Sequence, residues 1–192
     1  MQKAPLLLLL LLMPAFVHGL LLADARLLPD KSLYLFGGYG NILFTNADFF
    51  LIPDAGVRIG MSDVEWGFKL WGIGIAADWK WQFFGDRYDS FYGLALDVEL
   101  GVTTAPFCLK ASPALIIDMM IIRDFHLFTS LRWTYNTLYP DSGMNFVPSL
   151  GFRLFTDETL SVIVEAGVGH FMKLDLSELQ IGFAVRYRLS GS

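Results

Sequence analysis

The sequence predicts an all-β fold: a closed, antiparallel, up-and-down transmembrane β-barrel of eight to ten strands. Two observations carry this prediction. Apolar residues alternate with polar or small ones in runs of about ten residues, which is the period of a strand and the length of a tilted strand that crosses a bilayer. The chain of 192 residues is 54% hydrophobic but only 17% charged. After the N-terminal stretch no apolar run reaches the roughly 20 residues of a spanning helix, so strands must account for the apolar content.

Residues 92–102 show the pattern, because Leu94, Leu96 and Val98 share one face while Asp97 and Glu99 share the other. Turn residues separate the runs, and no helical pattern lies between them to supply a parallel crossover. Strands are predicted over 31–39, 54–61, 90–103, 109–121, 126–138, 145–155, 160–172 and 178–190, and region 64–84 holds either two strands or one.

The strand count depends on Trp71-Gly72, where the apolar residues change parity. A tight turn there gives ten strands. A bulge there gives one long strand and a total of eight, if 31–45 stays outside the wall. Both numbers are even, as single-chain bacterial barrels require; we favour ten.

The N-terminus has the pattern of a secretory signal peptide. Lys3 gives the positive start, and residues 6–17 form an apolar segment too short to span a bilayer comfortably. Ala23-Asp24-Ala25 fits the small-residue rule for cleavage, so the prediction is a signal peptide over 1–25 and one barrel domain over 26–192.

Two alternatives stay open at this end of the chain. Val17-His18-Gly19 is a second cleavage motif, upstream of the first. The apolar stretch could also remain as an uncleaved anchor.

Charged residues in the predicted strands fall on one parity, which we assign to the lumen. A soluble barrel would have its charges outside, so this placement indicates a wall that faces lipid. The interpretation is a set of ion pairs that fills the lumen, since an unpaired buried charge is costly; the alternative is a narrow polar conduit. The predicted lumen charge network is Arg58, Glu65, Lys69, Asp78, Lys80, Asp97, Glu99, Lys110, Asp118, Arg132, Arg153, Glu165, Arg186 and Arg188.

Aromatic residues of the outward parity gather near the strand ends, as in the interfacial girdles of membrane barrels. The alternative is that aromatic residues simply favour strands. The predicted aromatic girdle is Trp79, Trp81, Phe83, Tyr92, Trp133, Tyr135, Tyr139 and Tyr187.

Several function classes are disfavoured. A net charge of −5 argues against a nucleic-acid partner, and the single Cys108 excludes a disulfide scaffold. We expect no metal site and no cofactor, because His and Cys do not cluster. We also expect no enzymatic activity, because neither His126 nor His170 stands beside a serine and an acid in a recognisable pattern.

The last predicted strand, Gly182-Phe-Ala-Val-Arg-Tyr-Arg-Leu189, resembles the C-terminal signal of small outer-membrane β-barrels of the OmpA, OmpX and OmpW type. It departs from that signal by ending in Leu189-Ser-Gly-Ser192 and not in phenylalanine. The resemblance implies a bacterial outer-membrane location, contact with outer-membrane lipids, and folding by the barrel-assembly machinery.

Segment 40–53 is the one long apolar connection, and it could cap the mouth, line a path for an apolar solute, contact a partner, or be strand. The leading functional hypothesis is a structural or envelope-integrity role for a barrel with a charge-paired, polar lumen. The alternative is a porin-like, narrow passage for small or apolar solutes. A lipid A-modifying enzyme is third.

Overall fold

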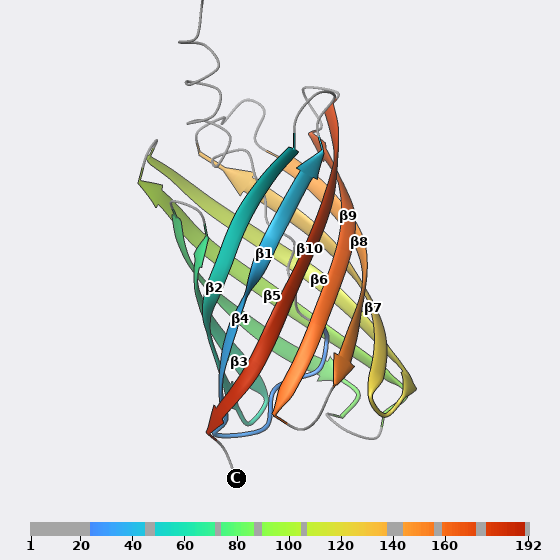
Figure 1. The fold of residues 1–192 in the computed structure, drawn as a ribbon. Helices are drawn as coiled ribbons and strands as arrows, with labels where there is room; N and C mark the ends of the chain where they lie inside the picture. The colour runs from blue at the N-terminus through green and yellow to red at the C-terminus, as the bar shows by residue number, and fades with distance from the viewer. Residues whose placement is uncertain are drawn as a thin grey trace, which may run out of the picture.

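The computed structural model describes residues 24–44, 49–71, 74–86, 90–104, 107–137, 144–155, 159–171 and 176–190. Ten strands form one closed barrel with an up-and-down order (Figure 1). They are β1 (Leu33–Phe44), β2 (Phe49–Met61), β3 (Val64–Trp71), β4 (Gly74–Phe84), β5 (Tyr92–Thr104), β6 (Phe107–Ile122), β7 (Phe125–Asn136), β8 (Met144–Phe155), β9 (Leu160–Phe171) and β10 (Leu176–Ser190).

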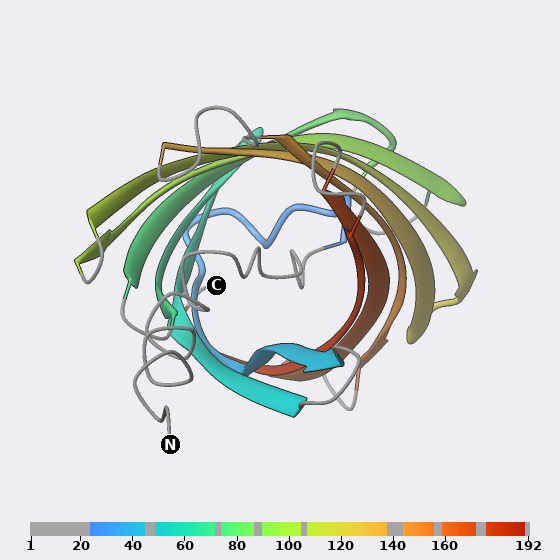
Figure 2. The same ribbon diagram turned by 90° about the horizontal axis from the view of Figure 1, so that it is seen from above.

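Each strand pairs antiparallel with the next one, and β1 closes the ring on β10, where Leu35 lies opposite Tyr187 (Figure 2). Closure leaves no edge strand. A membrane barrel needs this, because an unpaired backbone group in hydrocarbon costs several kcal/mol. The prediction of a ten-stranded antiparallel barrel is confirmed.

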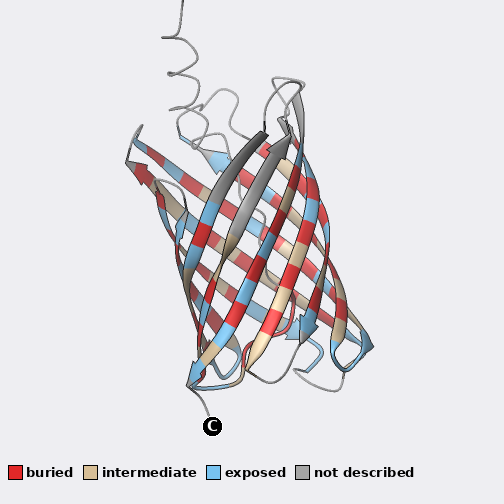
Figure 3. Ribbon diagram, in the orientation of Figure 1, coloured by how far each residue is buried: buried red, intermediate tan, exposed pale blue. Residues whose placement is uncertain are grey.

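Burial alternates along the parts of the strands whose side chains the structure describes, as the colours of Figure 3 show. In β6 the buried residues include Lys110, Ser112 and Asp118, while Phe107 and Leu109 on the other face are 68% and 49% exposed. An apolar outside around a polar inside is the arrangement of membrane barrels. Among the residues that the structure describes, no helix is long and apolar enough to cross a membrane.

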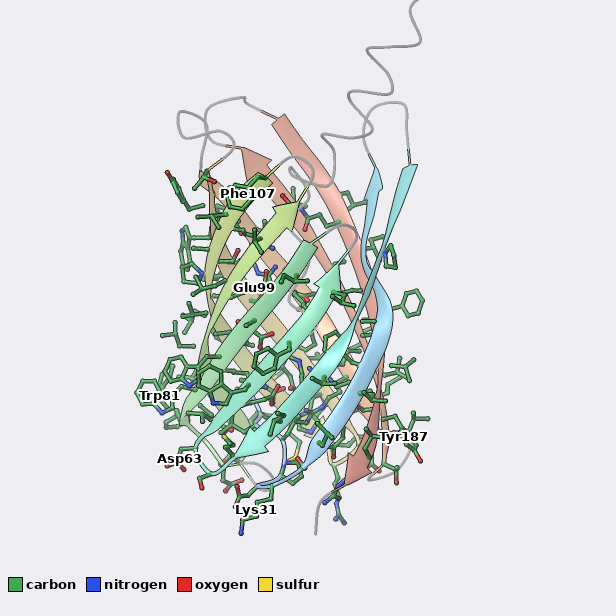
Figure 4. The ribbon with its side chains drawn as sticks, turned by 90° about the vertical axis from the view of Figure 1, so that its left-hand side faces the viewer. Lys31, Asp63, Trp81, Glu99, Phe107 and Tyr187 are labelled. Atoms are coloured by element: carbon green, nitrogen blue, oxygen red, sulfur yellow. The ribbon has the colours of Figure 1, made fainter. Side chains whose placement is uncertain are left out.

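The two ends of the barrel are distinguished by the chain termini. We call the end with Lys31, Asp63 and Tyr187 the proximal end, and the end with Phe107 the distal end (Figure 4). Strand β1 begins and β10 ends at the proximal end, where Leu33 pairs with Ser190.

Of the alternatives left open for segment 40–53, strand is the one that the structure shows over its described residues. Residues 40–44 continue β1 and 49–53 belong to β2, with Ile42 opposite Leu51. The register of β1 shifts after Tyr39 against both of its neighbours. Such a bulge adds one residue and so breaks the period of two on which the prediction depended. At Trp71 the parity change marks the end of β3, as the ten-strand alternative requires.

Candidate functional site in the barrel lumen

The lumen holds a stretch of chain that belongs to no strand. Residues 24–32, which we call the lumen strap, run inside the ring of strands before β1 begins (Figure 2). Asp24 and Ala25 have no exposed surface, and Arg26 is 1% exposed. An eight-stranded barrel is just filled by its own side chains; in this ten-stranded one the strap occupies part of the added room.

The strap leaves the lumen through a turn at the proximal end. The amide of Lys31 donates to the carbonyl of Gly60 over 2.9 Å, and the amide of Gly60 donates back to Ser32 over the same distance. Lys31 has a φ of 55°, the left-handed conformation that reverses a chain sharply. The Asp30 carboxylate also accepts a 2.8 Å hydrogen bond from the amide of Ser62, so the turn is fixed to the β2–β3 connection.

Asp24 lies among three cationic side chains from three different strands. Its carboxylate contacts Arg153 of β8, and lies 3.8 Å from Arg186 of β10 and 4.0 Å from Lys80 of β4. The Lys80 ammonium also donates to the main-chain oxygens of Asp24 and Arg26, over 3.2 and 2.8 Å. Asp24 therefore balances cations on opposite parts of the wall.

Arg26 makes a second set of contacts. Its Nε atom donates to Asp118 Oδ1 over 2.8 Å, its Nη1 donates to the carbonyl of Asp86 over 2.9 Å, and its Nη2 donates to the carbonyl of Ser90. The same Asp118 oxygen lies 3.1 Å from Nδ1 of His126. The strap is thus joined to β6, β7 and the β4–β5 connection.

Main-chain amides of the strap use wall side chains as acceptors. Leu27 donates to Gln82 Oε1 and Leu28 donates to Glu65 Oε2, each over 3.1 Å. Glu65 has no exposed surface and also pairs with Arg58 and Lys80, at 2.6 and 2.9 Å. A buried carboxylate with this many donors is well compensated.

A second ion cluster lies on the wall beyond the strap. Glu99 of β5 lies between two lysines: it contacts Lys69 of β3, and its Oε1 is 2.7 Å from Lys110 of β6. Lys69 also lies 3.8 Å from Asp54. Asp54 was not predicted as a lumen residue, because it stands at the start of the predicted strand 54–61.

Hydroxyl groups form further contacts inside the barrel. Ser130 lies 2.7 Å from the Ser149 hydroxyl, and both serines donate to Glu165. His126 bonds to Asp118, so it and Ser130 stand in different clusters. His126 is buried in the lumen.

Arg132 differs from the other cations of the lumen. It is 1% exposed, and its three guanidinium nitrogens have no hydrogen-bond or ion-pair partner among the residues that the structure describes. Asp97 faces it across Ala114 in the β5–β6–β7 register, and its carboxylate oxygens also lack a hydrogen-bond partner within that part of the chain.

The structure places almost all of the predicted lumen charges on the inside. Arg188 is half-buried near the proximal rim. The others are at most 6% exposed: Arg58, Glu65, Lys69, Asp78, Lys80, Asp97, Glu99, Lys110, Asp118, Arg132, Arg153, Glu165 and Arg186. The charges that the prediction missed are Asp24, Arg26 and Asp54; the first two lie in an irregular segment without alternation, next to the apolar leader.

The predicted girdle residues lie on the outer wall. Trp79 is half-buried beside Trp66, its partner on β3, and Tyr139 lies outside the described residues. The remaining six are 38–51% exposed: Trp81, Phe83, Tyr92, Trp133, Tyr135 and Tyr187. Trp81 and Tyr187 lie toward the proximal end (Figure 4).

No family model and no curated protein matches the sequence. Among solved structures, a KdgM porin covers 84% of this chain and 99% of its own, with 9% identity and a TM-score of 0.47. The outer membrane protein Ail of Yersinia pestis covers 83% and 100%, with 8% identity and a TM-score of 0.42. A designed transmembrane β-barrel covers 85% and 100%, with 15% identity and a TM-score of 0.42. These likenesses concern the barrel fold alone, and membership of the OmpA, OmpX and OmpW group stays a prediction.

Proposed function

We propose that this chain is an integral protein of the bacterial outer membrane whose lumen is closed, and that it serves a structural, envelope-integrity role. The observation that carries the proposal is the burial of the lumen strap. Asp24, Ala25 and Arg26 are inaccessible within a ring of strands that has no wide aqueous channel to spare. The strap occupies the lumen and forms ion pairs with several strands. Such a barrel is suited to stability in the membrane and not to the passage of solutes.

The outer wall supports the membrane location. Leu70, Leu150 and Phe107 are 63–68% exposed on the outer wall. Transfer of such apolar side chains from water to an apolar environment is favourable in free energy. The strand charges lie on the inside, and aromatic side chains stand near both ends. In water such a surface would far exceed the apolar patches of soluble monomers; in a bilayer it meets hydrocarbon.

The contacts of the strap support the closed lumen. Its charged groups reach β4, β6, β8 and β10, so moving it would break ion pairs around the ring together. The passage hypothesis depended on 40–53 as an apolar loop, and that segment is mostly strand. Contacts with outer-membrane lipids, and assembly through β10 by the barrel-assembly machinery, are part of the same proposal.

Electrical recording tests the closed lumen. The processed protein is purified from the outer membrane and inserted into planar bilayers, and solute uptake is followed in parallel by liposome swelling. We expect neither steady conductance nor sugar uptake. The matched variant Arg26→Ala releases the strap from Asp118, and we expect it to show frequent openings. A steady open channel in the unchanged protein would contradict the proposal.

The structural role needs a cellular measurement. A strain without the gene is compared with strains that carry the unchanged chain or a chain without residues 24–32, at equal protein levels. We expect the deletion strain to admit an apolar dye and to become detergent-sensitive, and only the unchanged chain to restore the barrier. Full barrier function in the deletion strain would overturn the envelope role and leave the closed lumen untouched.

A further inference from the structure

We infer that the signal peptide is removed between Gly19 and Leu20, so that the mature protein keeps Asp24 and the whole lumen strap. The sequence by itself favours a different position, after Ala25, which would remove Asp24. Residues 1–23 lie outside the described structure, whereas Asp24 is described and lies buried in the lumen.

Three buried cations surround the carboxylate of Asp24. Lys80, Arg153 and Arg186 are all at most 5% exposed, and the Asp24 carboxylate is within 4.0 Å of each of them. Loss of Asp24 would leave these three cations close together without the carboxylate between them, which is an unfavourable state for buried charges.

The position of the cut also decides which N-terminal ammonium group the mature chain carries. A cut after Ala25 removes the Asp24 carboxylate and creates an α-ammonium group on Arg26, a residue that is only 1% exposed. The lumen would lose one negative charge and gain one positive charge, a change of two units toward positive. The main-chain oxygen of Asp24, which accepts from Lys80 over 3.2 Å, would also be lost.

The sequence offers a cleavage motif upstream of Asp24. Val17-His18-Gly19 follows the apolar segment 6–17 directly and has a small residue at its last position. Signal peptidase acts before the barrel folds, so the folded structure does not direct the enzyme. It shows instead which product can fold with its lumen charges balanced, and that product begins upstream of Asp24.

Intact mass spectrometry of the protein purified from the outer membrane is the direct test. The inference rests on export, which the proposed function assumes. A mass that includes residues 20–25 supports the inference. A mass that begins at Arg26 overturns it and leaves the outer-membrane proposal standing, whereas an unprocessed chain that never reaches the outer membrane overturns both.

Two matched substitutions locate the site independently of folding. Signal peptidase needs small residues at the first and third positions before the cut, so a phenylalanine at either position is poorly accepted. We expect Gly19→Phe to abolish cleavage after residue 19, leaving the precursor or a product cut after Ala25, and we expect Ala23→Phe to be processed at the normal rate. The reverse pattern would overturn the inference.

A third pair of variants tests the role of Asp24 in the mature protein. We expect Asp24→Asn to lower the temperature at which the folded band disappears on a semi-native gel. Asp63→Asn, at an exposed position in the proximal β2–β3 connection, should leave this temperature unchanged. Equal temperatures for both variants would show that the lumen does not need the Asp24 charge, and the reason for the upstream cut would fail.

Discussion

The Nε atom of Arg26 donates a 2.8 Å hydrogen bond to Oδ1 of Asp118, which lies 92 residues further along the chain. The same oxygen is 3.1 Å from Nδ1 of His126, so one carboxylate joins the strap to both β6 and β7. The remaining guanidinium nitrogens of Arg26 donate to the carbonyls of Asp86 and Ser90. Arg26 is therefore compensated at every nitrogen only while the strap stays in place.

The first prediction concerns Asp118→Asn. The variant leaves the buried guanidinium of Arg26 without a counter-charge, and removal of one partner from a buried ion pair costs about 3–5 kcal/mol. We expect the free energy of unfolding to fall by an amount in this range, measured by urea unfolding in lipid vesicles with tryptophan fluorescence. Asp124→Asn changes an exposed residue of the β6–β7 turn and is the control, with an expected change below about 0.5 kcal/mol. Equal unfolding midpoints would contradict the role given to Asp118.

The second prediction uses two glycines with opposite surroundings. A Cβ atom at Gly67 would stand 2.2 Å from the Asp78 carboxylate, which pairs with Arg58 at 3.0 Å, whereas a Cβ at Gly37 meets nothing within 4 Å. Gly67→Ala must displace Asp78, and such overpacking costs about 1–3 kcal/mol. Gly37→Ala should be neutral or gain about 0.4–1 kcal/mol, because it restricts the unfolded chain. The same unfolding assay checks both, and a Gly67→Ala barrel as stable as Gly37→Ala would show that Asp78 can move freely.

The sequence was sufficient to predict which strand residues face the lumen, but it was insufficient to predict which lumen side chains pair with one another. Alternation is a local property, so parity placed Lys80 and Arg132 on the inside of their strands. Partners are not local: the register and the side-chain directions put Lys80 against Glu65 and Asp24, and leave Arg132 without an ion pair in the described part of the chain. The alternation of residues along the sequence does not predict ion pairs between different strands.

Two further differences have equally specific causes. The bulge at Tyr39 shifts the register of β1, so that the apolar residues beyond it no longer keep the expected phase. The lumen strap belongs to no strand and has no alternation, and its first residues adjoin the apolar leader. From the sequence, Asp24 and Arg26 are therefore interpreted as residues next to a signal-peptide cleavage site. In the structure Arg26 pairs with Asp118, and Asp24 lies near Arg186 in the lumen.

The third prediction compares two lumen arginines. Arg132 has no ion-pair partner among the described residues, whereas Arg153 contacts Asp24. Arg132→Met removes a buried charge that makes no ion pair with a described residue, so we expect the free energy of unfolding to stay the same or to rise by about 1–3 kcal/mol. Arg153→Met removes one of the cations that lie around Asp24, so it should lower the free energy of unfolding by about 3–5 kcal/mol. Urea unfolding in vesicles measures both values. If Arg132→Met were the more damaging change, the Arg132 charge would be stabilised in the lumen and the prediction would fail.

The fourth prediction tests which solvent the outer wall meets. Leu150 is 64% exposed at the middle of β8, and Leu189 is 50% exposed at the proximal end of β10. A lysine on the lipid-facing surface costs about 2–4 kcal/mol at the bilayer midplane and about 0–1 kcal/mol near the interface. Leu150→Lys should therefore destabilise the folded protein in vesicles far more than Leu189→Lys. In water the two exposed positions would tolerate lysine equally well, so equal stabilities would mean that the apolar wall does not face hydrocarbon.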